Sequence, residues 1–86
     1  MLSSQRGHAA TPDLQAWAQE VAKRADPAVE TEVLFEDDSN TFILRLAKDA
    51  RVLVFRLSAA QVYGNGRESE CERTLNRKIK DLWNLL

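Results

Sequence analysis

The sequence predicts an α+β domain in which one helix precedes and another follows a three-stranded antiparallel sheet. Three observations predict it. Three short apolar stretches stand close together in the middle of the chain, which is typical of neighbouring strands. Turn-forming residues separate them, and apolar residues at helical spacing lie on each side. We therefore expect the order α-β-β-β-α in one domain over residues 11–86.

The first ten residues are small and polar, and we expect a disordered leader at 1–10. Thr11, Pro12 and Asp13 then form a helix start: a hydroxyl cap, a proline at the first helical position and an acid in the first turn. The apolar side of this helix is Leu14, Trp17, Ala18, Val21 and Ala25. Pro27 ends the helix, because a residue before proline is pushed out of the α region.

The apolar stretches 33–35, 42–44 and 52–55 are predicted to pair as a meander. The first hairpin sets Phe35 opposite Phe42, and the second turns at Asp49 and Ala50. The registers of both hairpins then place their apolar residues on the same inner face. A one-residue slip in either register would move these residues to the other face. This face holds Thr31, Val33, Phe35, Phe42, Leu44, Leu46, Leu53, Phe55 and Leu57. We expect both helices to cover it, with Trp17 and Trp83 closing its ends.

Two further helical segments follow the predicted sheet. Ser58 and Gln61 have the spacing of a capping box, which predicts a single helical turn. A long helix is predicted from about residue 67 to residue 85. Its apolar stripe is Cys71, Leu75, Ile79, Leu82 and Leu86, with Trp83 beside it.

The outer face of the predicted sheet is partly apolar. It holds Glu30, Glu32, Leu34, Ile43, Arg45, Ala47, Val52, Val54 and Arg56, with Glu32 opposite Arg45 as a favourable cross-strand pair. Three interpretations stay open: a solvated face, one helix on each face, or a protein contact such as a symmetric dimer. The residues of that contact would be Leu34, Ile43, Arg45, Val52, Val54 and Arg56.

Charge is unevenly distributed along the chain. The formal net charge of −1 gives no overall attraction to nucleic acid or to an acidic membrane. Residues 1–44 carry three bases against eight acids, and residues 45–86 carry nine against five. A basic cluster on the last helix predicts an alternative nucleic-acid site, composed of Arg73, Arg77, Lys78 and Lys80. The other interpretation is a solvated face with pairs such as Arg73 with Glu70 and Arg77 with Asp81.

A loop of small residues precedes the last helix, with the order Gly64, Asn65, Gly66 and Arg67. Backbone N–H groups of such a loop, followed by a helix start, are able to hold an anion. The competing interpretation is a flexible connection that lets the helix turn back onto the sheet. The acids Glu68 and Glu70 follow at once and would repel a phosphate.

The sequence indicates no enzyme. His8, the single histidine, lies in the expected leader, and Cys71, the single cysteine, lies on an apolar stripe. No metal-ligand spacing and no phosphate-binding glycine motif is present, so we expect no cofactor, metal or small-molecule substrate. The absence of a cysteine pair, of a signal-peptide pattern and of a long apolar segment predicts a cytoplasmic protein without membrane contact.

The order α-β-β-β-α with both helices on one sheet face resembles the topology of double-stranded-RNA-binding domains. The resemblance covers most of residues 11–86 as an order of elements. Members of that family share a basic start to the last helix and a characteristic loop between the first two strands. Here Glu68 and Glu70 begin the helix, and Asp37 and Asp38 lie in the loop. The resemblance therefore implies a fold and no binding residues.

These observations together predict a small non-catalytic protein-interaction module that self-associates through the open sheet face. The partner would be a second copy of the chain or another protein. The alternative is a nucleic-acid-binding domain that uses the basic side of the last helix.

Overall fold

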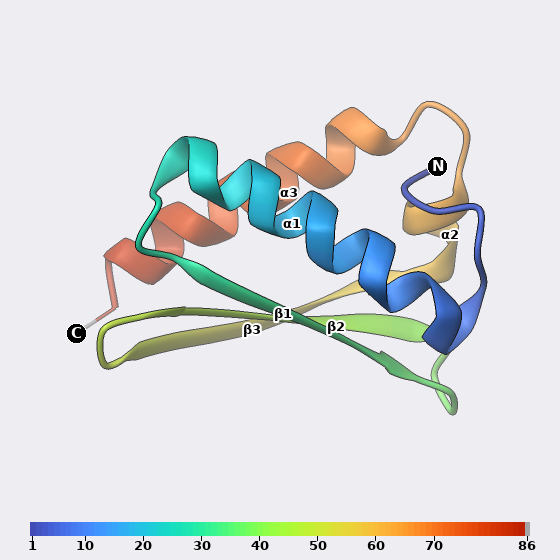
Figure 1. Ribbon diagram of the computed structural model, residues 1–86, viewed down its shortest axis with the longest axis horizontal. Helices are drawn as coiled ribbons and strands as arrows, with labels where there is room; N and C mark the ends of the chain where they lie inside the picture. Colours follow the sequence, from blue (N-terminus) through green and yellow to red (C-terminus); the bar gives the residue numbers. More distant parts are fainter. Residues whose placement is uncertain (86) are drawn as a thin grey trace.

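A computed structural model describes residues 1–85 and confirms the predicted α+β fold. Its elements are η1 (Gly7–Ala10), α1 (Thr11–Ala25), β1 (Glu30–Glu36), β2 (Thr41–Lys48), β3 (Arg51–Ser58), α2 (Ala59–Tyr63) and α3 (Glu68–Trp83). The sheet has the order β1-β2-β3, and α1 and α3 lie side by side on one of its faces (Figure 1). The arrangement with one helix on each face is thereby excluded. Leu86, the last position of the predicted stripe, lies outside the described residues.

The strand register is the predicted one in both hairpins. Phe35 lies opposite Phe42, and Leu44 lies opposite Phe55. Asn40 ends the first turn with φ of 52°, and Asp49 begins the second with φ of 55°. Asparagine and aspartate tolerate this left-handed conformation better than most side chains, so the composition of each turn supports its geometry.

The core lies between the sheet and the two long helices. α1 packs mainly on β1, whereas α3 packs across β3 and β2. The buried side chains of the helices are Leu14, Ala18, Val21 and Ala22 from α1, and Cys71, Leu75, Ile79 and Leu82 from α3. From the central strand, Phe42, Leu44 and Leu46 are almost fully buried. Each such side chain is worth about 1.5–3 kcal/mol of burial, so this layer dominates stability.

The helix ends follow the predictions in part. The capping box is confirmed: the Gln61 backbone N–H donates to the Ser58 hydroxyl, and the Ser58 backbone N–H donates to the Gln61 side chain. The first helix differs, because Thr11 is its first residue and Ala10 takes the cap position. The Thr11 hydroxyl donates to the His8 carbonyl instead, which joins η1 to α1.

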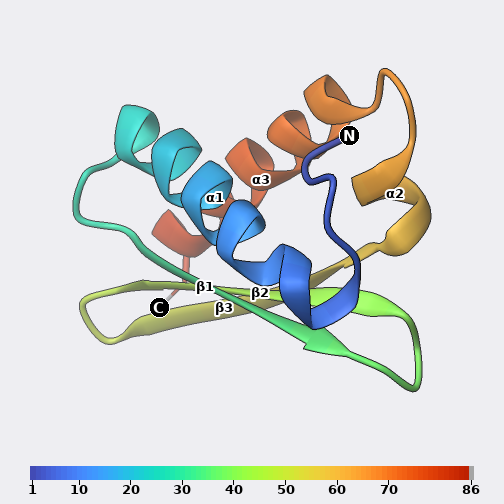
Figure 2. The same ribbon diagram turned by 45° about the vertical axis from the view of Figure 1, so that its right-hand side comes forward.

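Residues 1–10, predicted as a disordered leader, lie against the domain in the structure. The Leu2 N–H donates to the Val62 carbonyl at 2.9 Å, and Ala10 is fully buried. Ser3 is buried and its hydroxyl donates to Asp13. Figure 2 shows this segment running beside α2 toward the start of α3. Each of these contacts joins a single residue to a different neighbour. No periodic pattern in the sequence therefore predicts them.

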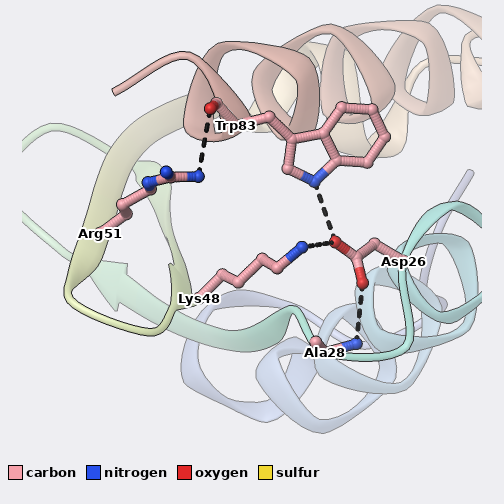
Figure 3. A network of polar contacts seen from close by, with 5 residues as sticks. All are labelled: Asp26, Ala28, Lys48, Arg51 and Trp83. Carbon is pink, nitrogen blue, oxygen red and sulfur yellow. Dashed lines mark hydrogen bonds and ion pairs between the residues drawn. The ribbon is translucent and has the colours of Figure 1, made fainter. Parts of the chain in front are cut away.

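A polar network closes the end of the core where α1 and α3 finish (Figure 3). One Asp26 oxygen accepts hydrogen bonds from the Lys48 ammonium at 2.6 Å and from the Trp83 indole at 2.9 Å. Its other oxygen accepts the Ala28 N–H, and Arg51 donates to the Trp83 carbonyl. Lys48 is the largest cause that lowers the pKa of Asp26. Trp17 packs against the core, as expected, whereas Trp83 is 39% exposed, lies outside the core cluster and donates a hydrogen bond to Asp26 instead.

Candidate interaction surface

The outer face of the sheet is covered by no described element, because both long helices lie on the inner face (Figure 1). Four aliphatic residues lie on it and form what we call the outer patch: Leu34, Ile43, Val52 and Val54. Leu34 is 53% exposed, Val52 44% and Val54 56%, whereas Ile43 is half-buried. Three of the four predicted aliphatic contact residues are therefore well exposed to solvent.

Charged residues interrupt and border the outer patch. Arg56 extends from β3 across the sheet to Glu36 on β1, at 3.0 Å, and also donates to the Thr41 hydroxyl. The Arg56 hydrogen bond, followed by one from Ser39, lowers the pKa of Glu36. Arg45 lies opposite Glu32, as predicted, yet the two form no ion pair within 4.0 Å among the described residues.

The two edges of the sheet differ, and the sequence interpretation missed this. On β1, two glutamines of α1 occupy the backbone groups that point away from β2. Gln15 donates to the Thr31 carbonyl and accepts the Val33 N–H at 2.7 Å. Gln19 accepts the Thr31 N–H and donates to the Val29 carbonyl, both at 3.3 Å. The two side-chain amides therefore stand where a fourth strand would pair.

The spacing of the two glutamines explains why this works. Residues four apart on a helix lie about 6 Å apart along its axis. Outward-pointing groups recur every second residue of a strand, which is about 6.6–6.8 Å. A glutamine amide carries both a donor and an acceptor, so two amides at this spacing satisfy two strand repeats. The signal in the sequence is Gln15 and Gln19 directly beside the apolar stripe of the first helix.

On β3, the outward backbone groups belong to Val52, Val54 and Arg56. Opposite residues of antiparallel strands turn their backbone groups either both inward or both outward. The outward direction of Thr31 and the observed register then assign Leu53 and Phe55 to β2, and the residues between them to the free edge. The Gln61 side chain takes the Ser58 N–H. Within residues 1–85, we find no hydrogen-bond partner for the outward groups of Val52, Val54 and Arg56.

The basic cluster of α3 divides in two. Arg73, Arg77 and Lys80 are exposed, and Lys78 lies with its ammonium 6.0 Å from the Phe55 ring centre. The intrahelical pairs Arg73 with Glu70 and Arg77 with Asp81 do not form within 4.0 Å in the described part of the chain. The solvent side of α3 thus presents three cations with no carboxylate of residues 1–85 within 4.0 Å.

The glycine loop before α3 uses its backbone groups within the chain. The Gly64 N–H donates to the Ala60 carbonyl, and the Arg67 N–H donates to the Gly64 carbonyl at 3.4 Å. Gly66 has φ of +74°, a conformation that favours glycine. Since Gly64 and Arg67 already donate within the loop, the predicted anion site of Gly64, Asn65, Gly66 and Arg67 gains no support, and the connecting role fits better.

His8 and Cys71, the single histidine and the single cysteine, make separate contacts. His8 contacts Asp37 at 2.9 Å and packs its ring edge on Phe35. Cys71 is buried and donates to the Gln61 carbonyl, and burial raises the pKa of its thiol. Residues 1–85 contain no group of three or more His, Cys, Asp or Glu side chains placed to hold a metal ion. None of the helices described is long and apolar enough to cross a membrane.

Comparison of the chain with protein-family models, curated proteins and solved structures gave no match. An inference about function therefore rests on the physical features of the outer patch, the sheet edges and α3.

Proposed function

We propose that this protein is a small non-catalytic interaction module that self-associates through the outer patch. The observation that carries the proposal is the exposure of Leu34, Val52 and Val54 on an uncovered sheet face. Isolated exposed aliphatic residues are ordinary in a monomer, but neighbouring ones rimmed by charge are typical of a contact surface.

A second copy of the chain is the occupant that we propose. In a two-fold contact each copy offers the same aliphatic surface, so apolar groups meet apolar groups. The formal net charge of −1 produces little repulsion between copies. Glu32 and Arg45 carry opposite charges on the same face and form no ion pair within the described residues. The charged border of the outer patch therefore offers both signs of charge to a second copy. We keep a cytoplasmic location as part of the proposal, on the single cysteine.

Sedimentation velocity at increasing concentration, up to hundreds of micromolar, tests this proposal. The wild-type chain should move from monomer to dimer, and Val54→Glu should weaken the dimer about tenfold or more, since 1.4 kcal/mol corresponds to a tenfold change. Ala16→Glu is the matched control, because Ala16 is exposed on α1 away from the outer patch. A wild-type chain that stays monomeric throughout would overturn the proposal.

A second candidate function is nucleic-acid binding by α3. The observation in its favour is that Arg73, Arg77 and Lys80 lack a carboxylate within 4.0 Å among the described residues. Duplex RNA and duplex DNA at low salt are the probes, and binding should weaken steeply with added salt. Arg73→Ala with Arg77→Ala should remove binding, whereas Lys23→Ala, at an exposed position on α1, should change it little. No shift with either duplex at low salt would exclude this function.

A further inference from the structure

The difference between the two sheet edges indicates how a second copy attaches. We infer that two copies pair antiparallel along their β3 edges and form one continuous six-stranded sheet. The inference rests on the proposed self-association and narrows its contact to the β3 part of the outer patch, Val52 and Val54, so Leu34 and Ile43 lie outside the seam. Its basis is that the outward groups of Val52, Val54 and Arg56 have no partner within the described residues, whereas those of Thr31 and Val33 do.

Strand β3 has the properties of a pairing edge. It is eight residues long, contains no proline and shows no bulge in its pairing with β2. Natural sheets protect such edges with prolines, bulges, short strands, charged side chains or a covering element, and of these β3 has only the charges of Arg51 and Arg56. β1 has such a cover in the glutamines of α1. On β3 we find no comparable hydrogen bond to the backbone from α3 among the described side chains.

One two-fold register uses every free backbone group of the edge. With the axis at Val54, that residue faces its own copy, and Val52 faces Arg56 of the second copy. All three outward residues then sit in hydrogen-bonded pairs. An axis at Phe55 would instead require the Ser58 N–H, which the Gln61 side chain already occupies. The register at Val54 also places no two like charges directly opposite one another.

The same register joins the two outer patches. Val52 and Val54 point to the outer face, so the side chains of both copies lie together across the seam. Arg56 keeps its bond to Glu36 in its own copy, which limits its charge at the seam. Because β1 is closed by Gln15 and Gln19, the assembly has no second open edge and stops at a dimer.

The two long helices lie differently over their edge strands. α1 lies over the β1 edge, close enough for its glutamines to reach the backbone, while α3 packs across both β3 and β2. α3 contacts β3 more than β2, but it reaches the central strand, which α1 does much less. On the side of the helix near the seam, Lys78 lies over Phe55.

Backbone amide exchange of the wild-type protein, measured by NMR at low and high concentration, tests the inference. Conditions with nine-tenths of the chains paired should slow exchange about tenfold at Val52, Val54 and Arg56, since exchange then proceeds through the remaining monomer. The amides of Thr31 and Val33 serve as internal controls and should change little. A dimer in which the β3 amides exchange as fast as in the monomer would overturn the edge geometry.

Two variants separate edge pairing from stacking of the outer faces. Val52→Pro removes an outward N–H without touching the β2 ladder and should abolish the dimer, whereas Val52→Thr keeps the N–H and should retain it. Leu34→Glu lies two strands from the seam, about 10 Å away, and should leave the dimer intact. Loss of the dimer in Leu34→Glu, with Val52→Pro still dimeric, would overturn the inference and leave the proposed self-association standing. A wild-type monomer at all concentrations would remove both.

Discussion

β1 and β3 are both edge strands of the sheet, and they differ in whether their outward backbone groups have hydrogen-bond partners among the described residues. Both strands present backbone N–H and C=O groups that no strand of the chain pairs. On β1, Gln15 and Gln19 satisfy these groups, and on β3 the described residues do not. The difference teaches that a helix beside an edge is able to replace a missing strand when its amides have the right spacing.

The two edge strands also differ in their exposed side chains, although each carries exposed aliphatic residues. The aliphatic side chains of Val52 and Val54 belong to the open edge, whereas the outward side chains of β1 include Glu30 and Glu32. Charged side chains on an edge strand discourage pairing, and aliphatic ones permit it. The closed edge thus carries two protections, whereas the open edge carries the charge of Arg56 and has no glutamine cover among the described residues.

The most direct way to break the comparison is to open the β1 edge. Gln15→Leu combined with Gln19→Leu keeps the helix but removes the partners of Val29, Thr31 and Val33. At about 0.5–1.5 kcal/mol for each of these four hydrogen bonds, the double variant should lower the free energy of unfolding by about 2–6 kcal/mol. Urea denaturation measures the loss.

The same double variant should also extend assembly beyond a dimer, since it opens a second edge, and light scattering would detect this. Gln5→Leu is the control, because Gln5 is exposed and its side-chain amide makes no hydrogen bond among the described residues. A double variant no less stable than this control would show that water replaces the glutamines without cost.

A single atom change sharpens the comparison further. In Gln15→Glu, the new carboxylate still accepts the Val33 N–H but turns a second acceptor toward the Thr31 carbonyl. The ionised form is therefore disfavoured, and the pKa of the new side chain should rise above its ordinary value of about 4.3. Above the raised pKa the variant should lose about 1–3 kcal/mol, comparable to the cost of an unsatisfied acceptor.

The sign of the pH dependence identifies the cause. Below the ordinary pKa the carboxyl is protonated in both folded and unfolded chains, so the penalty vanishes. It grows as the pH rises through the raised pKa of the folded state. Urea midpoints between pH 4 and 8, taken relative to the wild type, should show a gap that widens with pH. A gap constant with pH would mean that packing, and not the acceptor, is responsible.

Much of the fold was predictable because it is set by local patterns. The parity of the apolar residues around two short turns fixes the register, and Ser58 with Gln61 defines its own cap. The closed edge was not predictable in the same way. Its partners, Gln15 and the backbone of Val33, are joined only by how the helix lies over the sheet, which no local spacing records.

Charge pairs mark a second limit of the sequence. Glu70 and Arg73 have suitable helical spacing, as do Arg77 and Asp81, yet neither pair forms in the described chain. Ion pairs between exposed side chains are weak, because water and side-chain entropy compete with them. Spacing therefore shows which ion pairs are permitted and not which ones form. The outer patch has the same limit: its residues were predictable from the strand register, but local spacing does not say whether a partner binds them.

The smallest effect concerns an ion pair that links the two edge strands. Arg56 of β3 is exposed and Glu36 of β1 is partly exposed, and their bond lowers the pKa of Glu36. A carboxyl with a lowered pKa stabilises the fold above its ordinary pKa, and this contribution is lost as the pH falls through the lowered value. Arg56→Gln should return the Glu36 pKa toward its ordinary value and change stability less than either glutamine variant.

An NMR titration of the Glu36 carboxyl, in wild type and in Arg56→Gln, measures this shift directly. The Ser39 hydrogen bond stays in both proteins, so part of the lowering should remain after the substitution. Edge pairing uses the backbone of Arg56 and leaves its guanidinium on Glu36, so the wild-type titration should be the same in monomer and dimer. Stacking of the outer faces would instead enclose the pair and displace the titration, which makes Glu36 a reporter of which surface the second copy meets.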